Sequence, residues 1–346
     1  MRYKLLGSSG LRVSELALGC MTFGEEWGFG ASKEESRKVF DAFALAGGNF
    51  IDTANFYTNG TSERLVGEFV ASERERFVIA TKYTLNVRPT DPNGGGNHRK
   101  NLVQSIEASL KRLKMDYIDL YWVHAWDSLT PIDEVMRALD DVVRAGKVLY
   151  VGVSDTPAWV VSRANMLAEL RGWSRFVGLQ IPYSLIERAP ERDLLPMAKT
   201  LDIGVTTWGA LGAGVLTGKY EKGKQGPKGD RLSGEGPWWQ GMLSDRNYAI
   251  AEQTRTVAAE IGKTPSQVAL AWVRAHQARA SIIPIVGART LRQLEDNLGS
   301  LAIDLPREHL DRLDAASKIE LGFPHDFGGT ALIYGETRGL IDNHRG

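Results

Sequence analysis

The chain alternates between short runs rich in β-branched and aromatic residues and longer segments whose apolar positions recur with helical spacing. An opening segment, residues 5–13, predicts a β-hairpin with a Ser-Gly turn. The predicted strands of the regular series lie at residues 14–19, 49–53, 76–82, 117–124, 148–154, 176–181, 203–209 and 281–287. The predicted helices that follow them lie at residues 32–46, 62–72, 97–113, 131–146, 157–170, 190–201 and 290–298, with the seventh strand reaching its helices only after a long loop.

Eight strand–helix pairs predict a parallel sheet, and eight is the number that closes a barrel. The fold class expected is therefore α/β, a (β/α)8 TIM barrel that forms a single domain over residues 1–346. The alternative is an open doubly-wound sheet, which would more often carry a G-x-G-x-x-G turn after its first strand. That position here reads LGCMTFGEEWGFG, which does not fit the motif and favours the barrel.

Three stretches exceed the minimal barrel. Residues 209–246 form a long loop that we interpret as a lid. Residues 264–277 predict an extra helix before the eighth strand. The tail, residues 318–346, has no clear periodicity, and the sequence leaves open whether it is ordered over the barrel mouth or disordered.

Composition excludes several classes of partner. Lys+Arg and Asp+Glu both number 42, so the formal net charge is zero and nothing favours binding to nucleic acid or a membrane surface. The N-terminus lacks a signal-peptide pattern, and no apolar stretch is long enough to span a membrane. A single cysteine, Cys20, indicates a reducing cytoplasmic setting. The six histidines lack metal-ligand spacing, so no metal is expected.

Four side chains of different chemistry fall at the predicted strand ends. Asp52, Lys82 and His124 end the second, third and fourth strands, and Tyr57 lies in the loop after Asp52. The carboxyl ends of the strands form the functional face of such a barrel. Each residue alone is more often structural, but together they indicate one shared site.

This set suits the reduction of a carbonyl group by hydride, which needs a proton for the developing alkoxide. A free tyrosine has a pKa of about 10 and is a slow donor at neutral pH. We expect Lys82 to lower the pKa of Tyr57, Asp52 to hold Lys82 charged, and His124 to hydrogen-bond the carbonyl oxygen.

The motifs around these residues resemble those of the aldo-keto reductase family. They are GNFIDTANFYTNGTSERLVG, FVIATK and DYIDLYWVHAWD, and the similarity extends over nearly the whole barrel, to the NLGS near residue 300. The resemblance implies an oxidoreductase in which Tyr57 is the general acid, Lys82 and Asp52 tune it, and His124 positions the substrate.

The resemblance also implies NADPH as cofactor, held by several strand ends. Matching positions for the nicotinamide end are Gly19, Met21, Asp52, Ser154, Asp155 and Gln180, with Trp208 as the aromatic residue on which the ring stacks. The family has Asn or Asp at the position of Asp155, and either residue can accept from the amide NH2 of the nicotinamide.

The phosphate end of the cofactor is implied at two segments. The first is GALGAGVLTGKY, residues 209–220, which resembles the family's phosphate loop but lacks its Ser-Pro start. Its candidate residues are Gly209, Ala210, Leu211, Gly212, Gly214 and Lys219, followed by Arg231 as a looser match. The second is PIVGARTLRQLEDNL, where Gly287, Arg289, Gln293 and Asn297 match positions that bind the adenosine 2′-phosphate and adenine. An arginine there favours NADPH over NADH.

Aromatic residues cluster in the loops expected over the site and predict a wall for an apolar, planar or sugar-like carbonyl substrate. They are Phe23, Trp27, Phe56 and Trp126, beside Tyr57 and His124, with Trp238 and Trp239 on the long loop. Ordinary packing of loops on the rim explains any one of them equally well.

Two other functions stay open. One is an NADPH-binding regulatory subunit of the potassium-channel β type, which shares this fold. The other is a Schiff-base aldolase with Lys82 as nucleophile. The sequence also leaves open whether the chain forms a homo-oligomer.

Overall fold

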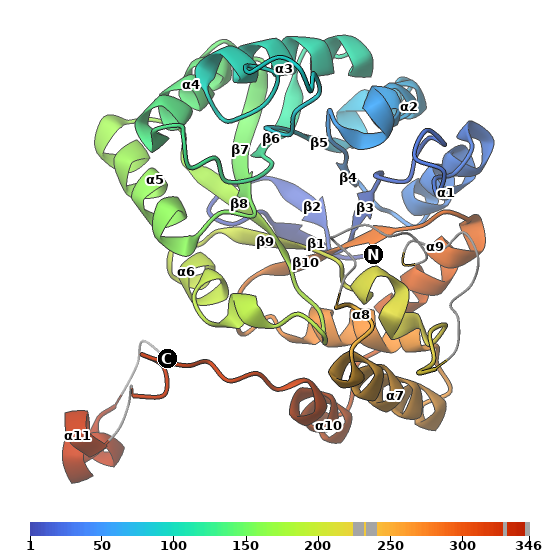
Figure 1. The fold of residues 1–346 in the computed structure, drawn as a ribbon, viewed down its shortest axis with the longest axis vertical. Coiled ribbons are helices and arrows are strands. Elements are labelled where there is room, and N and C mark those ends of the chain that lie inside the picture. The colour runs from blue at the N-terminus through green and yellow to red at the C-terminus, as the bar shows by residue number, and fades with distance from the viewer. Residues whose placement is uncertain (224–231, 233–240, 328–330, 343–346) are drawn as a thin grey trace.

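The structure, a computed structural model, describes residues 1–223, 232, 241–327 and 331–342. Eight parallel strands close into a barrel in the order β10-β3-β4-β5-β6-β7-β8-β9 (Figure 1). The strands are β3 (Ala17–Gly19), β4 (Phe50–Asp52), β5 (Val78–Tyr83), β6 (Ile118–Val123), β7 (Val148–Ser154), β8 (Phe176–Pro182), β9 (Gly204–Trp208) and β10 (Ile282–Gly287). The predicted (β/α)8 barrel is confirmed, and the open sheet is excluded.

Helices surround the barrel as the periodicity predicts (Figure 1). They are α1 (Lys33–Leu45), α2 (Thr61–Val70), α3 (Arg99–Leu113), α4 (Ile132–Arg144), α5 (Ala158–Arg171), α6 (Leu194–Thr200) and α9 (Leu291–Leu298). The further helices are α7 (Asp245–Glu260), α8 (Pro265–Ala275), α10 (Arg307–Ser317) and the short α11 (Ala331–Tyr334). Ser32 caps α1 by accepting from the Glu35 amide at 3.3 Å.

Short 3₁₀ turns also occur among the described residues. They are η1 (Tyr57–Gly60), η2 (Arg74–Arg76), η3 (Ala189–Glu191), η4 (Gly212–Thr217), η7 (Gly299–Ala302) and η8 (Gly335–Leu340). Of the described helices, none is both long enough and apolar enough to cross a membrane.

A tryptophan fills much of the barrel interior. Trp122 is fully buried, and a Cβ added at Gly152 or Gly178 would lie only 2.4 or 2.8 Å from its ring. Glycine is therefore required on the two neighbouring strands β7 and β8. The hairpin β1 (Tyr3–Leu5) and β2 (Arg12–Ser14) adds Leu6 and Val13 to this interior cluster. The core leaves the carboxyl ends of the strands free for chemistry.

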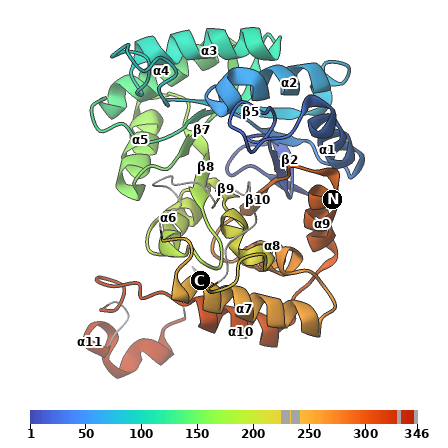
Figure 2. The ribbon, with the colours of Figure 1, turned by 45° about the vertical axis from the view of Figure 1, so that its right-hand side comes forward.

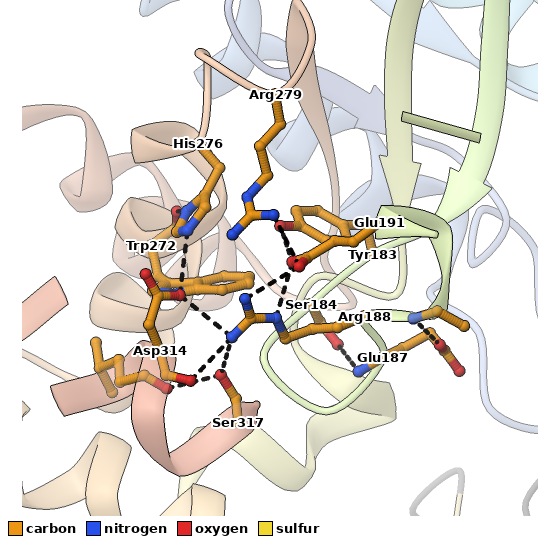
Figure 3. Close-up of polar contacts among 12 residues, drawn as sticks. Tyr183, Ser184, Glu187, Arg188, Glu191, Trp272, His276, Arg279, Asp314 and Ser317 are labelled. Carbon is orange, nitrogen blue, oxygen red and sulfur yellow. Dashed lines mark hydrogen bonds and ion pairs between the residues drawn. The ribbon is translucent and has the colours of Figure 1, made fainter. Parts of the chain in front are cut away.

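A buried ion network fixes α10 to the barrel (Figure 3). Arg188, in the loop after β8, donates to Glu191 at 2.8 Å and to the Ser317 hydroxyl of α10 at 2.8 Å. Its guanidinium lies 5.3 Å from the ring centroid of Trp272 on α8. Arg279 donates to the second oxygen of Glu191 at 2.8 Å. Because each charge has several partners, this network joins three segments that are far apart in sequence.

The described part of the C-terminal tail does not cover the barrel mouth. After α10 the chain runs outward, and α11 and η8 lie outside the ring of helices in both views (Figures 1 and 2). Their apolar side chains, such as Leu332 and Leu340, are exposed. Of the two placements that the sequence left open, the described residues of the tail do not adopt the one over the mouth.

Candidate active site

The four predicted catalytic side chains meet at the mouth of the barrel. Asp52 ends β4, Lys82 lies one residue before the end of β5, and His124 directly follows β6. Tyr57 begins η1, in the loop that leaves β4. Because β4, β5 and β6 are successive neighbours in the barrel, their carboxyl ends bring these groups together.

Lys82 is the buried centre of the group. It is fully buried and forms an ion pair with the carboxylate of Asp52, which is itself 3% exposed. Its ammonium also donates to the Thr53 carbonyl oxygen at 2.8 Å. The second carboxylate oxygen of Asp52 accepts from the Gln180 amide at 2.9 Å. Both charges are thus paired and hydrogen-bonded, as buried charges need to be.

The phenol ring of Tyr57 lies between Lys82 and His124. The Lys82 ammonium nitrogen lies 4.8 Å from the ring centroid of Tyr57. The His124 ring meets the same phenol edge-on, with centroids 5.7 Å apart and planes at 82°. The His124 Nδ1 is buried and has no hydrogen-bond partner among the described residues. The imidazole therefore has unused hydrogen-bonding capacity at the site.

The loop that carries Tyr57 has an unusual backbone. Thr58 and Asn59 both have positive φ, 44° and 53°, and Gly60 follows at 85°. Asn and Gly tolerate this left-handed region well. The Thr58 hydroxyl anchors the turn by donating to the Phe23 carbonyl oxygen at 2.7 Å. The sequence Thr-Asn-Gly therefore provides the turn that directs Tyr57 to the mouth.

Burial and charge set the protonation states. Burial lowers the pKa of Lys82, but the charge of Asp52 and the phenol of Tyr57 outweigh it and hold the pKa above its ordinary value. Burial, and secondly the charge of Lys82, lower the pKa of His124 well below its usual range, so the imidazole is neutral at pH 7. A charged Lys82 is a poor nucleophile, which disfavours the aldolase alternative.

The pKa of Tyr57 differs from the prediction. Burial raises it, and the opposing charge of Lys82 does not cancel that effect, so the pKa lies above its ordinary value. The phenol thus holds its proton at neutral pH. Lys82 does lower the pKa of Tyr57, as predicted, but desolvation raises it by more.

The residues predicted for a nicotinamide lie around the same mouth. Trp208 ends β9 with 36% of its surface exposed, and its indole N–H donates to the Asp155 carboxylate at 3.1 Å. Ser154 ends β7, where it is paired in register with Gln180. The Gln180 amide donates to Asp52, so it joins the cofactor candidates to the catalytic group. Gly19 ends β3 in register with Asp52, and Met21 follows it in the turn.

A cavity of about 300 Å³ lies between the loop after β9 and the start of α9. Its lining includes most of the residues predicted for the phosphate end of a cofactor. They are Gly209, Ala210, Leu211, Gly214, Lys219, Gly287, Arg289, Gln293 and Asn297. The structure therefore brings together two segments that are about 70 residues apart in the chain.

The backbone amides of two glycines in this loop are already paired within it. The amide of Gly212 donates to the Gly209 carbonyl oxygen at 2.7 Å, and that of Gly214 donates to Leu211 at 3.0 Å. Gly212 does not line the cavity. Since both N–H groups are paired inside the loop, they are not open to a phosphate. Gly214 has φ 99°, and a Cβ there would lie 2.6 Å from Lys219, so glycine is required for conformation. Arg231 lies outside the described residues.

The start of α9 has a partner that sequence reasoning missed. The Leu291 amide donates to the Glu35 carboxylate of α1 at 2.8 Å. The Gln293 side chain accepts from the Arg289 amide at 2.8 Å, and the Asn297 amide donates to the Gly287 carbonyl oxygen at 3.4 Å. Glu35 lies 256 residues from Leu291, so no local signal could have found this contact.

The predicted aromatic wall is present only in part. Trp27 lies 5.6 Å from Phe56 and 6.2 Å from Tyr57, ring centroid to centroid. Trp126 is 46% exposed, but its ring meets that of Trp159, edge-on at 6.3 Å, and does not belong to the group formed by Trp27 and Phe56. Phe23, in contrast, is fully buried and meets Phe69 edge-on at 6.1 Å, so it belongs to the core and offers no surface to a substrate. Trp238 and Trp239 fall outside the part of the chain that the structure describes. No cluster of three or more metal-ligating side chains occurs in that part.

Comparison with known proteins decides the family. The model of the aldo/keto reductase family matches residues 15–318. The chain belongs to the aldo/keto reductase family. It is an oxidoreductase, and this family generally uses NAD(P)H. The norsolorinic acid reductase stcV of Emericella nidulans is 39% identical over 329 residues, which cover 92% of this chain and 82% of the relative. An aryl-alcohol dehydrogenase of Pestalotiopsis microspora is 37% identical over 338 residues, which cover 95% and 85%.

Proposed function

We propose that this aldo/keto reductase reduces an aldehyde or ketone to the alcohol with NADPH, and that its substrates are aryl carbonyl compounds. The observation that carries the proposal is the buried Lys82–Asp52 pair beside the phenol of Tyr57 at the barrel mouth. The names of the relatives, a reductase of norsolorinic acid and an aryl-alcohol dehydrogenase, support the aryl class. The aromatic side chains of Trp27 and Phe56 suit a planar ring.

The residues present fit NADPH. Trp208 exposes its indole at the mouth, and the next residue, Gly209, lines the cavity together with Lys219 and Arg289. A guanidinium binds a 2′-phosphate through several donors, which favours NADPH over NADH. When bound, the cofactor supplies the hydride that adds to the carbonyl carbon.

The protein supplies the proton and the orientation. Tyr57 donates its phenolic proton to the carbonyl oxygen as the C–H bond forms, which gives the neutral alcohol. Lys82 stabilises the phenolate left behind, and Asp52 keeps Lys82 charged and in place. Neutral His124 hydrogen-bonds the carbonyl oxygen and sets its angle to the hydride.

The test is a panel of aryl and aliphatic aldehydes and ketones, with NADPH consumption followed by absorbance. We expect turnover with aryl carbonyl compounds, and we expect Tyr57→Phe to lower it at least ~100-fold with NADPH binding nearly intact. Unchanged turnover in Tyr57→Phe would remove the proposed acid. An absence of NADPH consumption with the whole panel, together with tight NADPH binding, would support the potassium-channel β type of role instead.

A further inference from the structure

A second cavity, of about 190 Å³, lies outside the barrel wall beside the first turns of α4 and α5. Its floor includes Val123, Val153 and Phe176, from β6, β7 and β8. Successive side chains of a strand point to opposite faces. Val123 accordingly joins the core cluster that packs against the helices, whereas His124 lies at the mouth beside Tyr57. This cavity is therefore separate from the candidate active site, and none of the four catalytic candidates lines it.

The cavity has the size and lining for one aromatic ring. An apolar cavity of about 150 Å³ is large enough to hold benzene. Trp126 and Trp159 both line this cavity, with their rings edge-on at 6.3 Å. Trp159 is 62% exposed, which is high for the largest apolar side chain. A planar ring seated here would cover both indoles and the valine floor.

A cation lies at the same cavity. Arg163 of α5 lines it, and the ion pair that the structure gives this guanidinium, with Asp133, is long at 3.8 Å. Asp127 also lines the cavity, but its carboxylate already accepts from the Asn97 and Leu129 amides and the Thr130 hydroxyl. Arg163 is thus the group with donors to spare, and a guanidinium pairs best with a carboxylate.

The cavity is also linked to the mouth of the barrel. The Trp126 amide donates to the Asp155 carbonyl oxygen at 3.3 Å. The Asp155 carboxylate in turn accepts from the indole of Trp208, the proposed nicotinamide platform. Two hydrogen bonds therefore connect Trp126 to Trp208 through Asp155.

We propose that this cavity is an accessory site for a single-ring aromatic carboxylate, which adjusts cofactor affinity through Trp126 and Asp155. The ring sits on the valine floor between Trp126 and Trp159, and the carboxylate pairs with Arg163. The binding part of the proposal is independent of the reductase function, while the effect on cofactor affinity rests on the proposed function.

Benzoate is the probe, titrated by calorimetry against the full chain without cofactor. Trp159→Ala should raise the Kd at least tenfold. Arg163→Gln should weaken benzoate several-fold but leave the neutral analogue benzamide unchanged. Met166→Ala is the matched control, because Met166 lies on the same helix, is 58% exposed and does not line the cavity; it should bind as the wild type does. Absence of benzoate binding at tens of millimolar, or equal Kd values for the wild type and Trp159→Ala, overturns the site.

A second titration measures NADPH affinity with and without saturating benzoate. We expect about a fivefold change in the wild type, at the low end of allosteric coupling, and none in Trp159→Ala. An unchanged NADPH Kd with benzoate bound refutes the coupling. If NADPH itself fails to bind, the proposed function fails, and the benzoate titrations still decide the accessory site.

Discussion

Replacing Asp52 by asparagine leaves the buried Lys82 ammonium without its carboxylate. Removal of one partner of a buried ion pair lowers the free energy of unfolding by about 3–5 kcal/mol. Here the loss has a ceiling, because Lys82 can release its proton. Deprotonating an amine whose ordinary pKa is 10.5 requires about 5 kcal/mol at pH 7. We therefore expect Asp52→Asn to lower the free energy of unfolding by about 3–5 kcal/mol at pH 7.

The sign of the pH dependence follows from the same proton. In the wild type the pKa of Lys82 is raised, so the group is charged in both states and its contribution persists until the pH exceeds 10.5. Where the loss reaches its ceiling, Lys82 is neutral in folded Asp52→Asn but charged in the unfolded chain, so the unfolded state binds more protons. The stability of the variant then rises with pH, and its deficit relative to the wild type shrinks by up to about 1.4 kcal/mol per pH unit.

Asp119→Asn is the matched control. Asp119 is also buried, and it pairs with Arg74 at 2.6 Å near the start of β6, at the other end of the barrel from His124. A guanidinium does not deprotonate in this range. The stability deficit of Asp119→Asn should therefore stay constant with pH, and the turnover of this variant should equal that of the wild type. Urea unfolding at pH 7, 8 and 9 measures the stability deficit of each variant relative to the wild type. A deficit of Asp52→Asn of about 1 kcal/mol or less, as for an exposed ion pair, would refute the buried charged pair.

Three further outcomes test separate parts of the structure. Desolvation by neighbouring groups raises the pKa of Asp155 to about 6. An ionised carboxylate accepts more strongly than a neutral group, so the NADPH affinity of the wild type relative to Asp155→Asn should fall as the pH drops from 7 to 5; a ratio that stays level would contradict this. Glu35→Gln removes a negative charge from the start of α9, so the Kd for NADPH should fall about threefold relative to the Kd for NADH. Arg289→Ala removes a positive charge there and should raise the same ratio. Glu191→Gln strips a carboxylate from buried Arg188 and should lower the urea-derived free energy of unfolding by about 3 kcal/mol, with the turnover of the folded enzyme unchanged.

The fold was predictable because its signals are local. Each strand–helix pair shows its own periodicity, and the cap at Ser32 and the extra helix α8 have recognisable patterns within a few residues. The grouping of Asp52, Lys82 and His124 followed from one topological rule, that the carboxyl ends of parallel strands meet at one face. Neither inference needed a long-range contact.

What the sequence could not show depends on contacts between distant segments. The link from Glu35 to α9 joins residues 256 positions apart, and the bond from Arg188 to Ser317 joins residues 129 apart. Phe23 was misplaced because an aromatic residue in a rim loop has the same local pattern whether it turns outward or, as here, into the core. The hydrogen bond of the Gly212 amide within its loop is likewise a property of the folded structure, since glycine permits many backbone conformations.

The raised pKa of Tyr57 is consistent with its role as an acid rather than opposed to it. Burial and the charge of Asp52 oppose the effect of Lys82 on the phenolic proton, and His124 is neutral, so Tyr57 keeps its proton before reaction. Hydride transfer changes this balance, because it places a new negative charge on the carbonyl oxygen beside Tyr57. Once the proton moves to that oxygen, the negative charge resides on a phenolate whose ring centroid is 4.8 Å from the Lys82 ammonium. A phenolate beside this ammonium is stabilised by its charge, and the more so in a buried site. Burial keeps the proton in place in the resting enzyme, and Lys82 makes its loss favourable only when a basic oxygen is there to accept it.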